Sequence, residues 1–240
     1  YFRGDVSLED LTKVVKEQRE VQWKVQQAAG ADFIPSNDYS LYDNVLDTAF
    51  TLNAIPKRYQ DLGLGEIDTY FAAARGYQGE AGDVKAFSMK KWFNTNYHYL
   101  VPEIDDDVKL QLRSTAFLEG YRQAKSLGIE TKPVLVGPFT FLQLADFRGS
   151  KGIDDVVDDV IAAYADIFKA AKEEGVSWIQ LDEPYLVYDL SEGDVALFSR
   201  IYERLLPQKQ GLHVVLQTYF GDIRDAYEVV TSLDFDGIGL

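Results

Sequence analysis

In its carboxyl-terminal part the sequence reads Ser177-Trp178-Ile179-Gln180-Leu181-Asp182-Glu183-Pro184, an apolar segment that ends in two carboxylates and a proline. This pattern predicts a buried strand that stops at its polar end. In both directions from it, predicted strands alternate with predicted helices. The strands are 132–138, 177–184, 211–218 and 236–240, and the helices are 106–127, 153–174, 195–205 and 223–231.

This alternation predicts one α/β domain, residues 1–240, built on a parallel sheet. Val134-Leu135-Val136 is a continuous apolar core, as expected for a strand covered on both faces. Polar residues follow several strands, at the edge where barrel enzymes place their sites. An open doubly wound sheet would usually carry a glycine-rich phosphate loop after its first strand, and the sequence has none. We therefore predict a partial TIM (β/α)8 barrel with about six of the eight strands.

The amino-terminal half is predicted to contribute two of these strands, 32–38 and 96–100. Ser7-Leu8-Glu9-Asp10 has the pattern of a capping box, and apolar residues at helical spacing follow it, which predicts a long amphipathic helix that ends at Gly30. A second helix is expected over 41–52. Glycines divide 56–84 into loop pieces around a short helix near 67–74, and such a long connection is more often functional than idle.

Composition excludes several classes of protein and site. The chain has 39 acidic and 24 basic residues and a net charge of −15, which argues against a nucleic-acid partner. It has no cysteine, so disulfides and thiolate metal sites are excluded, and its only histidines, His98 and His213, are too few for a histidine-rich metal cluster. The sequence shows no apolar run long enough to cross a membrane and no apolar core of a signal peptide after Tyr1, so we expect a cytoplasmic protein.

The strongest candidate for a binding surface is Lys90-Lys91-Trp92-Phe93-Asn94-Thr95-Asn96-Tyr97-His98-Tyr99-Leu100-Val101-Pro102-Glu103. The aromatic residues supply rigid apolar walls, Asn94 and Asn96 supply directional donors and acceptors, and a lysine supplies a charge for a carboxylate or phosphate. The alternative is a buried aromatic strand whose polar atoms pair with backbone. His98 has a better claim to a functional role than His213, which lies early in an apolar strand and is expected to be structural.

Asp182 and Glu183 end a predicted strand, so their side chains point to different sides and at most one readily faces a barrel mouth. Such a carboxylate could act as a general base or bind an amine. It could equally cap the next loop or pair with a lysine. Gly137-Pro138-Phe139-Thr140 could present backbone groups and a hydroxyl to a ligand, although a tight turn between a strand and a helix explains the glycine and proline as well.

Four segments carry a resemblance to a known family. The segments 91–103, 132–138, 178–184 and Thr218-Tyr219-Phe220 occur in the order and spacing seen in the amino-terminal half of the cobalamin-independent methionine synthases, and the similarity runs over essentially the whole chain. Members of that family resemble two face-to-face (β/α)8 barrels. The carboxy-terminal barrel holds zinc and homocysteine, and the polyglutamate form of 5-methyltetrahydrofolate lies between the barrels.

The resemblance implies a function in methionine biosynthesis, as part of a methyltransferase that moves a methyl group from 5-methyltetrahydrofolate polyglutamate to homocysteine. It implies that Lys91 binds folate, and we expect Trp92, Asn94, Asn96, Asp182 and Glu183 to contribute to substrate binding, with no catalytic residue and no metal ligand in this chain. The zinc ligands would belong to the other barrel. The family's first strand with its basic segment would precede Tyr1, and its last strand would follow Leu240, so the chain is expected to be an inactive fragment of the amino-terminal barrel.

Two alternatives remain open at this stage. The chain could be a stand-alone binding module for a polyanionic small molecule, or a purely structural barrel that keeps its partner barrel rigid. Affinity for folate polyglutamates would separate the first from the second.

Overall fold

The computed structural model describes residues 1–239, and its centre is a parallel sheet of four strands in the order β10-β9-β8-β6. The helices are α1 (Leu8–Ala28), α2 (Asn44–Thr51), α3 (Lys57–Gln60), α4 (Glu66–Arg75), α5 (Glu119–Ser126), α6 (Pro138–Leu144), α7 (Ile153–Glu173), α8 (Glu192–Leu205) and α9 (Tyr227–Ser232), with the short 3-10 helices η1 (Ala116–Leu118), η2 (Pro184–Val187) and η3 (Leu206–Gln208). The strands are β1 (Tyr77–Gly79), β2 (Gly82–Val84), β3 (Met89–Lys91), β4 (His98–Leu100), β5 (Glu103–Ile104), β6 (Val134–Val136), β7 (Asp146–Phe147), β8 (Trp178–Asp182), β9 (His213–Gln217) and β10 (Gly237–Gly239).

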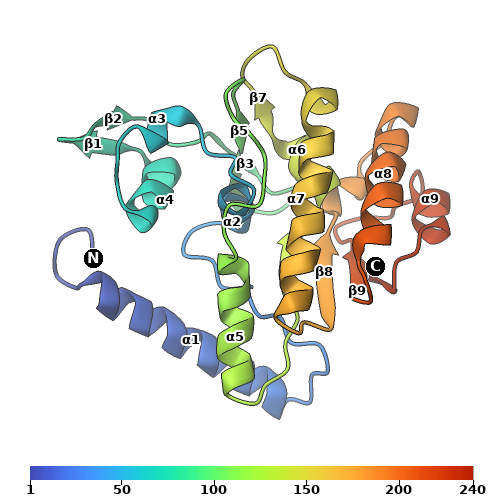
Figure 1. Ribbon diagram of the computed structural model, residues 1–240, viewed down its shortest axis with the longest axis horizontal. Helices are drawn as coiled ribbons and strands as arrows, with labels where there is room; N and C mark the ends of the chain where they lie inside the picture. Colours follow the sequence, from blue (N-terminus) through green and yellow to red (C-terminus); the bar gives the residue numbers. More distant parts are fainter. Residues whose placement is uncertain (240) are drawn as a thin grey trace.

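The predicted α/β architecture with a parallel sheet is confirmed. Strands β6, β8, β9 and β10 occur in this order along the chain, each pairs in parallel with the next, and helices lie between them. Strand β7, which lies between β6 and β8 in sequence, pairs in parallel with β5 in a separate sheet. Helices α7 and α8 pack against each other alongside the sheet (Figure 1). The buried residues of α7 run from Val156 to Ala171 and recur at helical spacing, so one face of the helix packs into the core. The predicted strand 236–240 corresponds to β10, and Leu240 lies outside the described residues.

The segment 34–37 extends the parallel sheet beyond β6, at the place of the predicted strand 32–38. Ser36 N donates to Lys132 O at 2.9 Å, and Lys132 N donates to Ile34 O at 2.8 Å. At the next residue along this segment, the side-chain amide of Asn37 pairs with the backbone of Val134 in place of a backbone peptide group. Its Nδ2 donates to Val134 O at 2.5 Å, and its Oδ1 accepts from Val134 N at 2.6 Å. An amide side chain thus completes the pairing that a longer strand would have provided.

Two predicted elements differ from the structure. Residues 96–100 do not form a strand of the parallel sheet, because β4 pairs antiparallel with β3 in a separate hairpin. The predicted helix 106–127 exists only from Ala116 onward, as η1 and α5. Residues before it are held by tertiary hydrogen bonds, since Gln111 N and Arg113 N donate to the carbonyl oxygens of Leu52 and Thr51 at the end of α2. The count of six barrel strands is therefore not confirmed: among residues 1–239, four strands and the segment 34–37 form the parallel sheet.

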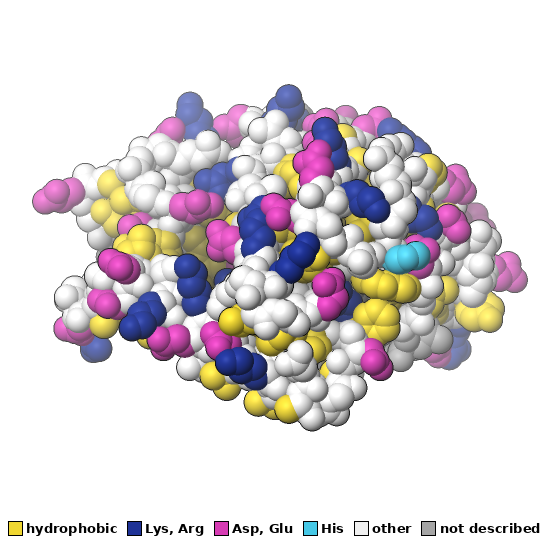
Figure 2. All heavy atoms as spheres, turned by 60° about the horizontal axis from the view of Figure 1, so that its bottom comes forward, with side chains coloured by type: hydrophobic (Ala, Val, Ile, Leu, Met, Phe, Trp, Pro, Cys, Tyr) yellow, Lys and Arg dark blue, Asp and Glu magenta, His cyan; other side chains and the backbone are white. Residues whose placement is uncertain are grey.

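Helix α1 begins at the predicted capping box, in which Asp10 N donates to Ser7 Oγ and Ser7 N donates to Asp10 Oδ2. Trp23 anchors the helix, because its ring is buried with Ile34 and its Nε1 donates to Pro35 O at 3.1 Å. The predicted amphipathic face is only partly used, since Val21 and Val25 are exposed. No helix in the described part of the chain is both long and apolar enough to span a membrane. From the lower side of Figure 1, acidic, basic and hydrophobic side chains are interspersed and neither charge dominates (Figure 2).

We predict that Asn37→Ala lowers the free energy of unfolding by about 1–3 kcal/mol, because it leaves the N–H and C=O of half-buried Val134 without their partners. Urea denaturation followed by circular dichroism measures the change. Asn94→Ala is the matched control, since Asn94 is exposed and its side chain forms no hydrogen bond within residues 1–239; that change should stay within about 0.5 kcal/mol. Equal effects of the two substitutions would contradict the proposed pairing.

Candidate functional site

The predicted binding stretch folds as the hairpin of β3 and β4 with a tight turn between them. Trp92 N donates to Tyr97 O at 2.7 Å, and Thr95 donates to Trp92 O through both its N, at 3.1 Å, and its Oγ1, at 2.7 Å. These bonds leave the side chains of Asn94 and Asn96 exposed at the tip of the turn. Trp92 is only 6% exposed and meets the rings of Phe93 and Tyr99 edge-on. The alternative of a buried aromatic strand therefore applies to Trp92 and Tyr99, while the amides face outward and the binding role of the stretch stays a prediction.

Lys91 is the last residue of β3 and lies opposite His98 in the hairpin. Both side chains are exposed. Within residues 1–239 the Lys91 ammonium forms no ion pair or hydrogen bond, whereas the ring Nδ1 of His98 lies 3.1 Å from Asn96 O. An exposed ammonium next to a buried aromatic core is available to an anionic ligand.

Aromatic contacts place the turn of this hairpin at the carboxyl ends of the parallel strands. The ring of Phe93 stacks on Tyr188 at a centroid distance of 5.1 Å and lies 5.4 Å from Phe220. Tyr188 follows β8 and η2, and Phe220 follows β9. We call Phe93, Tyr188 and Phe220 the aromatic cluster. It brings together two of the segments that the sequence singled out, 91–103 and 218–220, and adds Tyr188, which follows the segment 178–184.

Asp182 lies at the carboxyl end of β8, below this cluster. Its half-buried carboxylate accepts from Gln180 Nε2 at 2.7 Å and from Tyr219 OH at 3.3 Å. The ring of Tyr219 contacts Phe220 edge-on at 4.7 Å. Burial raises the pKa of Asp182, while the two hydrogen bonds and the nearby Lys132 ammonium oppose that rise. This carboxylate is thus held next to the aromatic cluster and could accept from a ligand N–H.

Glu183 points to the other side of the strand, as predicted, and its side chain is fully buried. Its Oε1 accepts from Phe139 N at 3.0 Å and Tyr202 OH at 2.5 Å, and its Oε2 accepts from Thr140 N at 2.6 Å. The carboxylate therefore caps the first turn of α6. A Cβ at Gly137 would overlap Glu183 Oε1, which explains the glycine of the segment 137–140. Burial raises the pKa of Glu183 to about 7, and hydrogen bonds from Thr140, Tyr202 and Phe139 oppose that rise.

Sequence reasoning missed Asp43, which holds the hairpin in place. This carboxylate is 1% exposed and accepts from Leu46 N at 2.8 Å, as the N-cap of α2, and from Leu100 N of β4 at 3.2 Å. Tyr97 OH, at the base of the turn, donates to its other oxygen. An aspartate just before a helical pattern is an N-cap signal, and that signal could have identified half of this role. The second half depends on a contact across more than fifty residues, which no local pattern encodes.

The other end of the binding stretch is structural. Glu103, in β5, is buried between Arg58 and Arg148, with its Oε1 2.9 Å from the Arg148 guanidinium. His213 lies at the start of β9, as predicted, with its Nδ1 3.1 Å from Asp236 Oδ1. Among residues 1–239 no group of three or more histidine, cysteine or acidic side chains is arranged to hold a metal ion.

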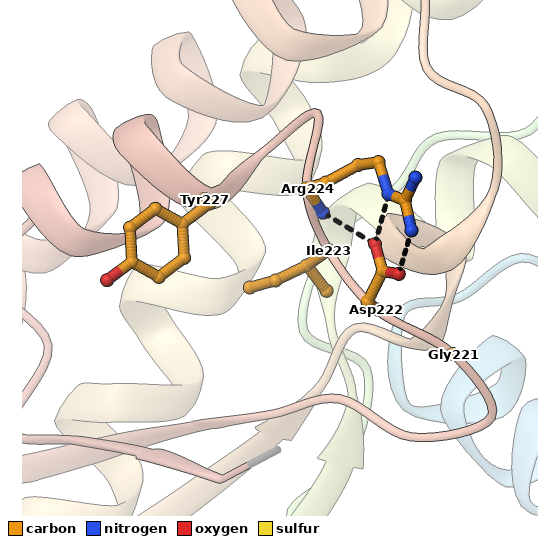
Figure 3. Close-up of a pocket in the computed structure, with 5 residues that line it drawn as sticks. All are labelled: Gly221, Asp222, Ile223, Arg224 and Tyr227. Atoms are coloured by element: carbon orange, nitrogen blue, oxygen red, sulfur yellow. Dashed lines mark hydrogen bonds and ion pairs between the residues drawn. The ribbon is translucent and has the colours of Figure 1, made fainter.

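A hollow of about 540 Å³ opens beside the loop after β9, lined by Gly221, Asp222, Ile223, Arg224 and Tyr227 (Figure 3). Arg224 Nε donates to Asp222 Oδ1 at 2.7 Å, and this bond lowers the pKa of Asp222 to about 2. The guanidinium is therefore already paired with a carboxylate. We assign no ligand to this hollow.

A family model and the individual relatives both match this chain along its whole length. The model of the family "Cobalamin-independent synthase, N-terminal domain" matches residues 1–240. The chain is 52% identical over 240 residues to the 5-methyltetrahydropteroyltriglutamate–homocysteine methyltransferase of Streptococcus suis, and 51% identical over 240 residues to that of Lactococcus lactis. It is 53% identical over 245 residues to the protein of the same name from Bifidobacterium adolescentis. In each case all of this chain matches, and it spans 32% of the length of the relative.

We predict that Glu183 makes the stability of the protein depend on pH. Because its pKa in the folded state, about 7, lies above the ordinary 4.5, the folded protein binds more protons than the unfolded chain between these values. Its contribution to the free energy of unfolding is fully present below pH 4.5 and is lost as the pH rises through 7. Glu183→Gln should remove on the order of 1–3 kcal/mol of this pH dependence.

Urea denaturation across this pH range tests the prediction. Glu80→Gln, a change at an exposed residue between β1 and β2, is the control and should keep the wild-type profile. If the Glu183→Gln profile runs parallel to that of the wild type, the carboxylate does not titrate as described.

Proposed function

The chain belongs to the family of cobalamin-independent synthases, through their N-terminal domain, and from this we propose that it binds 5-methyltetrahydropteroyltriglutamate for a methyltransferase that converts homocysteine to methionine. The relatives that match it along its whole length are named for this substrate and for homocysteine. The observation that carries the proposal is the exposed Lys91 ammonium, without an ion pair in the described chain, at the carboxyl ends of the parallel strands. A cation there suits the carboxylates of a glutamate tail.

Each predicted site residue has a place in this proposal. Lys91 binds carboxylates of the tail, and Asn94 and Asn96 supply donors and acceptors from the exposed turn. Trp92 is the buried wall on which the turn rests. Asp182 accepts from an N–H of the ligand. For Glu183 we propose support through α6, because both of its oxygens already accept hydrogen bonds from Phe139, Thr140 and Tyr202.

We further propose that residues 1–240 form one domain and that its parallel sheet is part of a (β/α)8 barrel. The order of the strands supports this, because the segment 34–37 and β6, β8, β9 and β10 lie side by side in the sheet in the same order as in the sequence, and all are parallel. The functional side chains also collect at the carboxyl ends of these strands, as in barrel enzymes. The long segment 38–131, which connects 34–37 to β6, contains the β3–β4 hairpin, and the turn of that hairpin lies at this edge.

The zinc implied by the family resemblance does not fit this chain. The sequence has no cysteine, and within residues 1–239 neither of its two histidines, on β4 and at the start of β9, belongs to a group of three or more side chains that could hold a metal ion. We propose that any zinc ligands lie outside residues 1–240, and we assign no chemical step to this chain. Its part in the reaction is to bind and orient the folate.

We predict that Lys91→Ala weakens binding of 5-methyltetrahydropteroyltriglutamate by about 1–2 kcal/mol, the scale of one partly exposed charge-assisted hydrogen bond. The loss should be larger for the triglutamate than for the monoglutamate and should shrink as salt is raised, since screening acts on exposed charges. Isothermal titration calorimetry at two salt concentrations measures both effects.

Lys90→Ala is the matched control. Lys90 is exposed in the same strand, but neighbouring residues of a strand point to opposite faces, so its removal should leave the affinity for the triglutamate nearly unchanged. Equal losses for monoglutamate and triglutamate without any effect of salt would show that Lys91 is a packing residue.

A further inference from the structure

We propose that the aromatic cluster is a stacking surface for the p-aminobenzoyl ring of the folate, the planar ring that joins the pterin to the glutamate tail. This inference rests on the proposed function and adds to it the residues that recognise a second part of the ligand. Three observations carry it: backbone strain, ring geometry and exposure, and position relative to Lys91.

Two members of the cluster have strained backbones. Phe93 has φ 52° and Phe220 has φ 81°, in the left-handed region that costs free energy for a bulky residue. They come from different loops, yet their rings lie 5.4 Å apart. A glycine, Gly221, directly follows Phe220, but the positive φ falls on the phenylalanine. Strain of this kind persists where the surrounding structure fixes it, and it is concentrated at ligand sites.

The rings of the cluster are nearly parallel and partly open to solvent. Phe93 makes interplanar angles of 20° with Tyr188 and 31° with Phe220, whereas the buried Trp92 meets its neighbours at 90° and 72°. Tyr188 is 46% exposed and Phe220 is 42% exposed. Tyr188 and Phe220 also contact Tyr185 and Tyr219 edge-on, so the solvent-exposed parts of these two rings, on either side of Phe93, are the surface that suits a further flat ring.

The cluster lies next to the cation that we assign to the tail. Phe93 is two residues after Lys91, at the start of the turn, and Asp182 lies beneath Phe220 through Tyr219. In a folate, the aminobenzoyl ring is joined directly to the first glutamate. A stacking surface and a lysine on one hairpin therefore match an aromatic ring that carries an anionic tail.

Titration of the full chain with two probes, p-aminobenzoyltriglutamate and the triglutamate peptide, tests this inference. The ring should raise the affinity about fivefold to tenfold in the wild type. In Tyr188→Leu and Phe220→Leu, which keep apolar bulk but lose the flat face, most of that gain should disappear while the affinity for the peptide stays the same. Phe2→Leu is the matched control, because Phe2 is an exposed aromatic that packs on Phe71 of α4, away from the sheet.

The outcomes separate this inference from the proposed function. If the peptide binds and the ring adds no affinity, the inference is wrong and the proposed function stands. If neither probe binds the wild type, the proposed function fails and the inference with it.

A further variant tests the strain. Phe220→Gly relieves the positive φ, so it should keep or raise the melting temperature while the contribution of the ring is lost. A clear fall in melting temperature with the ring contribution intact would show that the cluster only fastens the hairpin to the sheet.

Discussion

The buried carboxylate of Glu183 is the contact on which the carboxyl ends of the strands depend. Its backbone N donates to Gln217 O, its side chain accepts from two backbone N–H groups of α6, and Tyr202 of α8 closes the set. The residue that directly follows β8 therefore joins a neighbouring strand and two helices. A carboxylate without these donors would cost several kcal/mol to bury. Asp182, the last residue of β8, points to the other side, where Tyr219 donates to it and in turn contacts Phe220 of the aromatic cluster.

The hairpin reaches this edge through a second buried carboxylate. Asp43 caps α2 and at the same time accepts from Leu100 N and from Tyr97 OH, so the start of a helix fixes the base of a turn far away in sequence. Burial raises the pKa of the Asp43 carboxyl group. Burial also raises the pKa of the neighbouring Asp47, to about 6. The rigid base leaves Lys91, Asn94 and Asn96 exposed at a defined place. Because the chain has a net charge of −15, an anionic ligand is repelled at long range, and the Lys91 ammonium can attract it only at short distance.

The spacing of apolar residues along the sequence predicted the individual strands and helices better than it predicted the contacts between them. The strands at 178–182 and 213–217 and the helix Ile153–Glu173 were predictable from apolar runs and helical spacing, and the side chains of Asp182 and Glu183 diverge as strand geometry requires. Residues 106–115 were predicted as helix and are not, and within them the N–H groups of Gln111 and Arg113 donate to the end of α2 instead of to a helical partner. The amide pairing of Asn37, the role of Asp43 and the aromatic cluster all join segments far apart in sequence. A motif indicated that residues near Lys91 and Asp182 matter, but only the fold showed how aromatic contacts bring their segments together.

We propose that the edge formed by the hairpin and the loops after β8 and β9 binds the folate. Amide hydrogen exchange of the full chain, with and without 5-methyltetrahydropteroyltriglutamate, tests it most directly, because exchange reports local protection segment by segment. If the folate binds there, protection should increase at 91–100, 183–190 and 218–222, with no change at the opposite ends of the strands near His213 and Trp178. Protection confined to those opposite ends, or to the exposed face of α1, would contradict it.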